Sequence, residues 1–160
     1  MRTLLAQDVL EILVFCIGRQ RYGVNLRDVE QVVRAVPATP LPRAPPVIEG
    51  VINLHGSAVA VLEIRARFGA HPKPVSVEDV LIVARAGDRR VAVRADRTAG
   101  LAKVDRAEVH DAAAVTSKAT YVAGVVTLPD GIVLIHDLRT FLTESEDAEI
   151  GLLMTESLGS

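Results

Sequence analysis

The chain has 160 residues, of which 49% are hydrophobic but only 3% aromatic, and its formal net charge at pH 7 is −2. This length predicts one domain or two very small ones, with a core of Val, Leu, Ile and Ala rather than aromatic rings. The balanced charge excludes a basic face for nucleic acid or for a lipid surface. The single Cys16 cannot form an internal disulfide and is expected to be a buried small hydrophobe.

The N-terminal region, residues 1–18, looks superficially like a signal peptide. Gln7, Asp8 and Glu11 interrupt its apolar run, and no small-residue cleavage site follows, which argues against that interpretation. No stretch of the sequence reaches the length needed to span a bilayer. We therefore expect a soluble, cytoplasmic protein.

Two types of regular structure are predicted in the first forty residues. Residues 9–17 are rich in β-branched and apolar types, and "GRQ" followed by "RYGVNL" completes a β-hairpin. The spacing of the apolar residues then changes from that of a strand to that of a helix. Asn25 can cap the start of this helix, and Pro37 cannot continue it. The residues at helical spacing are Leu26, Val29, Val33 and Val36. The pattern predicts a helix of about three turns near 25–36.

Residues 37–46, "PATPLPRAPP", contain five prolines. They exclude a helix or a central strand. The P-x-x-P spacing is compatible with a polyproline ligand for a partner domain. An extended crossover between two strands is favoured, because the segment joins two strongly structured regions.

Three further hairpins follow along the chain. One turns at His55-Gly56, a second spans 79–96 and turns at Gly87-Asp88, and a third turns at "PDG" between apolar runs. The acidic stretch 144–160 is predicted to be a terminal helix or a frayed end.

An internal repeat organises these elements. A shift of 74 pairs Gly50 with Gly124 and Leu54 with Leu128, and a shift of 69 pairs Gly18 with Gly87. Residues 8–143 therefore form one domain built from two copies of one unit, 8–71 and 79–143. Each unit offers about five short strands, and such units close into barrels to avoid open edges. We expect an all-β fold of two packed five-stranded β-barrel subdomains with a groove between them.

The sequence offers little for catalysis or for metal binding. Its four histidines are scattered, and His136 and Asp137 would point to opposite faces of a strand. Glu63 and Asp137 occupy matching positions, where each is expected to join a local network with Arg65 or Arg139. We predict no catalytic residue, no metal and no cofactor, and an interaction module rather than an enzyme.

Three stretches resemble the CheW family of bacterial chemotaxis coupling proteins over residues 8–143: "FCIGRQRYGVNLRDVEQVV", "PRAPPVIEGVINLHGSAVAVLEIRARFG" and "YVAGVVTLPDGIVLIHDLRTFL". "GVINLHG" is the most specific part. The resemblance implies two SH3-like barrels and a non-catalytic adaptor for signal transduction. Its implied partners are the cytoplasmic tip of a chemoreceptor and the regulatory domain of a CheA-type histidine kinase, in arrays that control a response regulator.

The resemblance also implies a partner-binding surface. Its residues here are Val29, Glu30, Gln31, Val32, Gly50, Asn53, Leu54, His55 and Gly56. The family usually has Arg where this chain has His55, and that change removes a permanent charge and a planar set of five donors. The alternatives are that His55 is an indifferent turn residue and that Gly50 and Gly56 serve backbone conformation alone.

Two other functions stay open. One is a divergent adaptor that binds a receptor or another CheW-like protein without coupling to a kinase, in a motility or developmental pathway. The other, of a different class, is a small ligand-binding barrel or enzyme, which would need a polar pocket of converging side chains. The sequence names neither the receptor, the signal nor the oligomeric state.

Overall fold

The computed structural model describes residues 8–65, 71, 73–111, 122–138 and 144–158. Within these residues the fold is all-β with one α-helix, α1, over Glu144–Leu158, which is one of the two alternatives predicted for the C-terminal stretch. The strands are β1 (Val9–Ile17), β2 (Gln20–Asn25), β3 (Val29–Arg34), β4 (Ile48–Leu54), β5 (Ser57–Leu62), β6 (Val80–Ala86), β7 (Arg89–Ala95), β8 (Arg97–Asp105), β9 (Val122–Leu128) and β10 (Gly131–His136). All four predicted hairpins are confirmed.

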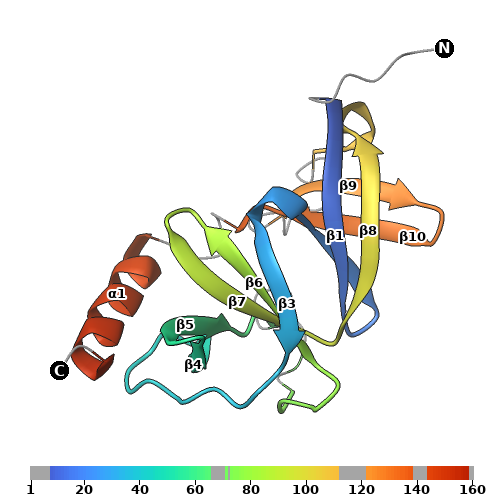
Figure 1. Cartoon of the computed structure of the whole chain (residues 1–160). Coiled ribbons are helices and arrows are strands. Elements are labelled where there is room, and N and C mark those ends of the chain that lie inside the picture. The colour runs from blue at the N-terminus through green and yellow to red at the C-terminus, as the bar shows by residue number, and fades with distance from the viewer. Residues whose placement is uncertain (1–7, 66–70, 72, 112–121, 139–143, 159–160) are drawn as a thin grey trace.

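The strands form two five-stranded sheets, each curled into a small barrel (Figure 1). The order in barrel A is β8-β1-β2-β10-β9, and the order in barrel B is β3-β6-β7-β5-β4. Most neighbours are antiparallel, but one pair in each barrel is parallel: β2 with β10 and β5 with β7. The two predicted five-stranded barrels are thus confirmed.

The predicted division into subdomains 8–71 and 79–143 is wrong for the barrels. Barrel B is the continuous stretch 29–95, whereas barrel A combines residues 9–25 with 97–136. Each barrel takes its first hairpin from one repeat and its other three strands from the other repeat. The parallel pairs cause this exchange, because they join the second strand of one repeat to the last strand of the other.

The repeat itself is confirmed at the level of strand register. Leu134 pairs with Tyr22 in barrel A, and the equivalent positions Ala60 and Val91 pair in barrel B. The hairpin register matches too, since Ile12 pairs with Asn25 and Leu81 pairs with Arg94.

Two glycines allow the chain to close each barrel. Gly50 lies under the proline-rich crossover, where a Cβ would stand 2.5 Å from the Thr39 carbonyl oxygen, and Thr39 pairs with Val51 in an isolated bridge. Gly124 lies under the equivalent crossing in barrel A, beside the bridge between His110 and Val125. Residues 37–46 are therefore a crossover, as predicted.

The helix predicted near 25–36 is wrong. Only a single 3-10 turn forms, over Leu26–Asp28, capped by the Asn25 side chain, and β3 follows at once. Four of the residues from 29 to 36 are valines, and their spacing fits a strand as well as a helix. Pairing with β6 decides the outcome, because β-branched side chains pack well on a pleated surface.

Three apolar clusters hold the fold together. One fills barrel A around Ile12 and Val133, and another fills barrel B around Val59 and Leu81. A third lies between the barrels and takes residues from both sheets, with Phe15 at its centre. The boundary between the barrels is thus a shared core, to which buried Cys16 lies adjacent in β1.

Among the described residues, no helix is both long and apolar enough to cross a membrane.

Candidate functional site

The first group of predicted binding residues lies on β3, an edge strand of barrel B. Val29 pairs with Ala84 and Val32 with Ile82, so both valines lie on the side of the sheet that faces the inter-barrel core. Val29 packs against that core, whereas Val32 is 40% exposed at its rim. Gln31 pairs with Val83 and lies on the side that faces the interior of barrel B.

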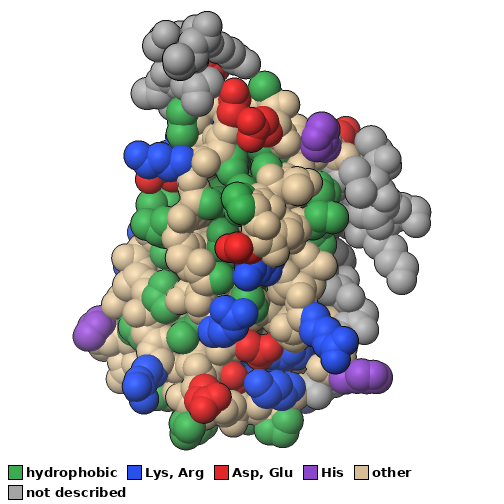
Figure 2. Space-filling view, turned by 90° about the vertical axis from the view of Figure 1, so that its right-hand side faces the viewer, with side chains coloured by type: hydrophobic (Ala, Val, Ile, Leu, Met, Phe, Trp, Pro, Cys, Tyr) green, Lys and Arg blue, Asp and Glu red, His purple; other side chains and the backbone are tan. Residues whose placement is uncertain are grey.

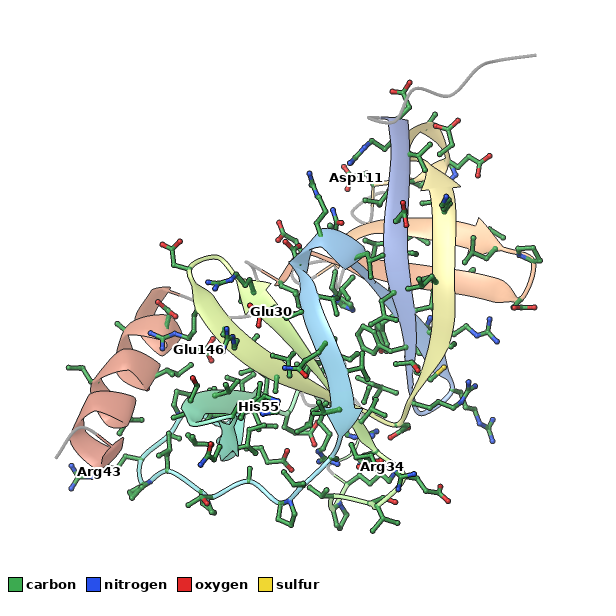
Figure 3. All side chains as sticks on the ribbon, in the orientation of Figure 1. Glu30, Arg34, Arg43, His55, Asp111 and Glu146 are labelled. Atoms are coloured by element: carbon green, nitrogen blue, oxygen red, sulfur yellow. The ribbon has the colours of Figure 1, made fainter. Side chains whose placement is uncertain are left out.

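Glu30 is the bulged residue of β3, and two arginines bind it. Its carboxylate lies 3.3 Å from Arg85 Nε and 2.8 Å from Arg90 Nε, so it ties β3 to the β6–β7 hairpin. Figure 3 shows Glu30 and Arg34 at the two ends of β3. Both ion pairs are partly exposed, and each adds little to stability in water.

The second predicted group surrounds the β4–β5 turn. His55 and Gly56 both adopt positive φ angles, 51° and 88°, which is typical of a two-residue type I′ hairpin. Asn53 Oδ1 accepts a hydrogen bond of 2.8 Å from the Gly56 amide. His55 is exposed at the tip, and Leu54 is buried in the interior of barrel B.

A groove of 490 Å³ runs beside this turn, between the proline-rich crossover and strands β4 and β5. Asn53 and Gly56 line it, together with Pro40 and Pro42. Gly50 does not contribute a contact surface, because it is buried beneath the crossover and its lack of a side chain is needed there.

The structure thus places both groups on barrel B, at its two edge strands. The Thr39–Val51 bridge joins the continuation of β3 to β4 and closes the sheet. We call this closure, from β3 through the crossover to the β4–β5 turn, the barrel seam. Its exposed residues among those predicted are Glu30, Val32, Asn53, His55 and Gly56.

Barrel B also contains a largely buried ionic cluster, most of which is not predicted from the sequence. Arg94 is 2% exposed at the end of β7, and its guanidinium contacts Glu49 at 3.0 Å and Asp79 at 2.9 Å. It also pairs with Glu63 and donates to the carbonyl oxygen of Lys73 at 2.6 Å. Each partner comes from a different part of barrel B, so one guanidinium ties these parts together.

A second arginine extends the cluster to barrel A. Arg65 pairs with Glu63, as the sequence predicted, and with Asp96. Asp96 accepts a 2.7 Å hydrogen bond from the Gly18 amide in the β1–β2 turn, and its own amide donates to the Cys16 carbonyl. The cluster therefore fixes the β7–β8 crossing between the two barrels.

Opposing influences set the pKa values in this cluster. Burial raises the pKa of Glu49 above its ordinary value, and Arg94 offsets only part of that rise. Burial also acts to raise the pKa of Asp79, but the Ser76 amide, Arg94 and Lys73 outweigh it and lower the pKa. Asp96 behaves in the same way, through the Gly18 amide and Arg65. Both aspartates are thus held as carboxylates.

The equivalent positions in barrel A carry different residues and line an open pocket of 380 Å³. Asn25 stands where barrel B has Arg94, and its short side chain accepts a bond from the Arg27 amide instead. The five positions equivalent to Glu49, Glu63, Asp79, Arg94 and Asp96 are Ala123, Asp137, Leu10, Asn25 and Arg27, and all five line this pocket. Of the four carboxylates in the barrel B cluster, only Glu63 has an acidic counterpart in barrel A, which is Asp137.

No pattern in the sequence marks Arg94 as the centre of a cluster. Its partners are spread from residue 49 to residue 79, and only the fold brings them together. One local signal exists: Arg94 interrupts the apolar run of β7, a position where a charge needs a buried partner.

Fold and site together define a class of protein: a double barrel of two five-stranded sheets with a shared core and an exposed turn beside the seam of one barrel. Comparison with known proteins gives the family. Residues 11–146 match the model of the CheW-like domain. The chain belongs to the CheW family.

Proteins from several bacteria are similar to this chain in sequence or in fold. The chain is 27% identical over 138 residues to the chemotaxis protein CheW of Rhizobium meliloti, covering 85% of this chain and 89% of that protein. It is 33% identical over 110 residues to protein FrzA of Myxococcus xanthus, covering 68% and 69%. The crystal structure of the scaffolding protein TtCheW from Thermoanaerobacter tengcongensis superposes with a TM-score of 0.73 and 26% identity, covering 79% of this chain and 88% of that one.

Proposed function

We propose that this chain is a non-catalytic adaptor that couples a methyl-accepting chemoreceptor to a CheA-type histidine kinase in the cytoplasm. The match to the CheW-like domain over residues 11–146 carries the proposal. The adaptor would act at receptor arrays through its partners, and it would transmit a signal by holding them in place. No cofactor is required for such a role.

The barrel seam is the surface that we assign to these partners. Val32 supplies exposed apolar area beside the partly buried Val29, which suits contact with an apolar side chain of a partner. Asn53, His55 and Gly56 supply a preorganised turn at the other edge. A contact of this size would bury modest area and bind weakly, so several contacts would be needed to hold an assembly.

Binding to the two partners tests the proposal directly. A helical fragment of a receptor tip and an isolated kinase regulatory domain would each be titrated into the chain by calorimetry. We expect Val32→Asp to weaken the receptor contact by at least tenfold. Ile132→Asp, on an exposed apolar residue of β10 in barrel A, is the matched control and should bind as the wild type does. Wild-type chain that binds neither partner would refute the proposal.

A second candidate is an adaptor that binds a receptor or another CheW-like protein without coupling to a kinase. Two observations favour it: His55 stands where the family usually has Arg, and the similarity extends to protein FrzA. Binding of the receptor tip without binding of the kinase domain would select this candidate. His55→Arg should then restore measurable kinase binding if the turn contacts that partner.

A further inference from the structure

The C-terminal helix α1 is attached to barrel B by a narrow apolar contact. It lies beside β5 and the β6–β7 hairpin (Figure 1). Ile150 is fully buried and joins the apolar cluster between the barrels, together with Ala60 of β5 and Val91 of β7. Leu152 is 64% exposed. Among the helix residues whose side chains the structure describes, Ile150 is the one that is fully buried, so apolar burial holds the helix mainly through this side chain.

Arg89 of β7 supplies a polar attachment for the same helix. Its Nε donates to Asp147 Oδ1 at 2.5 Å, and its Nη2 donates to the Asp147 carbonyl oxygen at 3.2 Å. Gly151 lies against the same guanidinium, because a Cβ there would stand 3.1 Å from Arg89 Nη2. Asp147, Ile150 and Gly151 are spaced i, i+3 and i+4, so they share one face of the helix. The Arg89 and Asp147 side chains are 25% and 49% exposed, so dissolved salt can screen their attraction.

The sequence of α1 gives the helix little stability of its own. Its 15 residues, "ESEDAEIGLLMTESL", include five acidic residues and neither Lys nor Arg, so no ion pair can form within the helix. Gly151 lies in its interior, where glycine lowers helix propensity. An isolated helix of this length is marginal in water. The helical state of α1 therefore depends on the contacts with barrel B.

The two barrels are held together more extensively than α1 is held to them. They share one apolar cluster, and β7 lies between β6 and β5 in a continuous ladder of strands. A region with few buried contacts opens locally at a lower free energy than the core does. Loss of the α1 contacts breaks no strand pairing, so the barrels can stay folded when the helix leaves.

We propose that α1 is an electrostatic latch on barrel B, which opens by local unfolding while both barrels stay folded. The contact between Arg89 and Asp147 sets the fraction of molecules in which the latch is closed. Opening withdraws Ile150 from the shared cluster and uncovers apolar area of β5 and β7. Higher ionic strength shifts the equilibrium toward the open state, because the contact is partly exposed. The latch is separate from the barrel seam and does not depend on coupling to a receptor or a kinase.

Native-state hydrogen exchange of the full chain, followed by mass spectrometry, tests the latch. We expect the amides of α1 to exchange faster than those of β1 and β6. Arg89→Gln should raise the exchange rate of α1 by about fivefold, as expected for loss of a partly exposed ion pair, and should leave β1 and β6 unchanged. Arg85→Gln is the matched control, because Arg85 lies in the same hairpin but pairs with Glu30, and it should exchange as the wild type does.

Three results of this experiment would overturn the proposal. The first is exchange of α1 at the same rate as the barrel strands, which would show that helix and barrels unfold together. The second is unchanged exchange of α1 in Arg89→Gln. The third is a rise in Arg89→Gln that β1 and β6 share, because the substitution would then act on the whole fold.

Salt dependence gives a second readout. A change from about 0.05 M to about 0.5 M salt should speed exchange of α1 in the wild type and leave Arg89→Gln almost unaffected. Equal salt dependence in the two chains would overturn the assignment of the latch contact to Arg89.

A double-mutant cycle with Asp147→Asn approaches the contact from the helix side, where a change cannot disturb the barrel. The cycle is needed because Asp147 lies near the N-terminus of α1, where a carboxylate also favours the helix dipole. We expect Arg89→Gln to speed exchange of α1 much less in a chain that already carries Asp147→Asn than in the wild type. Independent effects of the two substitutions would contradict the proposal.

Discussion

The two barrels share one backbone plan but differ in what occupies equivalent positions. In barrel B, Arg94 and its carboxylates fill the end of the barrel, whereas in barrel A the equivalent positions line an open pocket. Register, crossings and closing bridges match in both. The two barrels therefore share register and closure although the residues at these charged positions of barrel B differ in barrel A.

The surfaces of the barrels differ as well. The side of the molecule that carries barrel A shows both hydrophobic and charged side chains (Figure 2). Leu101 and Ile132 of barrel A are both more than half exposed. Barrel B carries the seam, the ionic cluster and the contact between Arg89 and helix α1. The charged contacts that tie separate segments of the chain together are thus more extensive in barrel B.

Removal of Arg94 should give the largest effect. Arg94→Ala would leave the buried Asp79 and the partly buried Glu49 and Glu63 without their shared cation, and we expect a loss of about 3–5 kcal/mol in the free energy of unfolding. The equivalent change in barrel A, Asn25→Ala, removes only a cap and should cost about 0.5–2 kcal/mol. Urea denaturation measures both. Similar losses of stability for Arg94→Ala and Asn25→Ala would show that these equivalent positions contribute equally to the two barrels.

Substitution of Gly50 and Gly124, the two glycines that lie under the crossings, should give the next largest loss of stability. A Cβ at Gly50 would stand 2.5 Å from the Thr39 carbonyl oxygen, which is backbone, whereas at Gly124 it would meet the Val109 side chain. A side chain can rotate away more cheaply than a backbone can move. We expect Gly50→Ala to cost about 3 kcal/mol and Gly124→Ala about 1 kcal/mol in thermal unfolding. A larger loss of stability for Gly124→Ala than for Gly50→Ala would contradict this explanation.

Acid should weaken barrel B through Asp79. Its pKa is lowered in the folded chain, so its contribution to stability is present above the ordinary pKa of about 4 and is lost as the pH falls through the folded value. Glu49 acts in the opposite direction, because its pKa is raised. We expect Asp79→Asn to flatten the fall in stability between about pH 5 and about pH 3.

The control for that titration is Asp130→Asn, at an aspartate that is exposed in the turn of barrel A. It should leave the acid dependence of the wild type unchanged. Denaturation midpoints at each pH give the curves, and parallel curves for Asp79→Asn and the wild type would contradict the assignment.

The hairpin turns should give the smallest effect. His55 holds a positive φ of 51°, which favours Asn, so His55→Asn is expected to raise stability by less than about 1 kcal/mol. The equivalent turn in barrel A, Pro129-Asp130, places its positive φ at Gly131 and offers no such gain. Differential scanning calorimetry would detect the change, and destabilisation would show that the His55 side chain has a structural partner.

Local features of the sequence predicted the fold well. Each hairpin carries its own turn residues, and the repeat was visible because glycines and apolar residues recur at fixed shifts. The exchange of strands between repeats was not predictable, because parallel pairing of β5 with β7 depends on residues far apart in the chain and leaves no local signal. The valines of β3 fitted two periodicities, and only pairing with β6 separates them.

The candidate site was predictable only where a motif marked it. "GVINLHG" located the β4–β5 turn, and Glu63 with Arg65 was expected as a local pair. The rest of the ionic cluster was not, because its members come from four separate segments. The contact between α1 and β7 was not predictable either, because Arg89 and Asp147 are 58 residues apart in the sequence.

Because barrel A combines two separate stretches of the chain, the two barrels can be completed only one after the other during synthesis. All of barrel B has left the ribosome once residue 95 is free, and it can fold then as an uninterrupted unit. The β1–β2 hairpin, which precedes barrel B in the chain, must wait for β10 before its own barrel is complete, with the apolar face around Ile12 uncovered in the meantime. The β1–β2 hairpin is thus synthesised before barrel B but reaches its final partners after it.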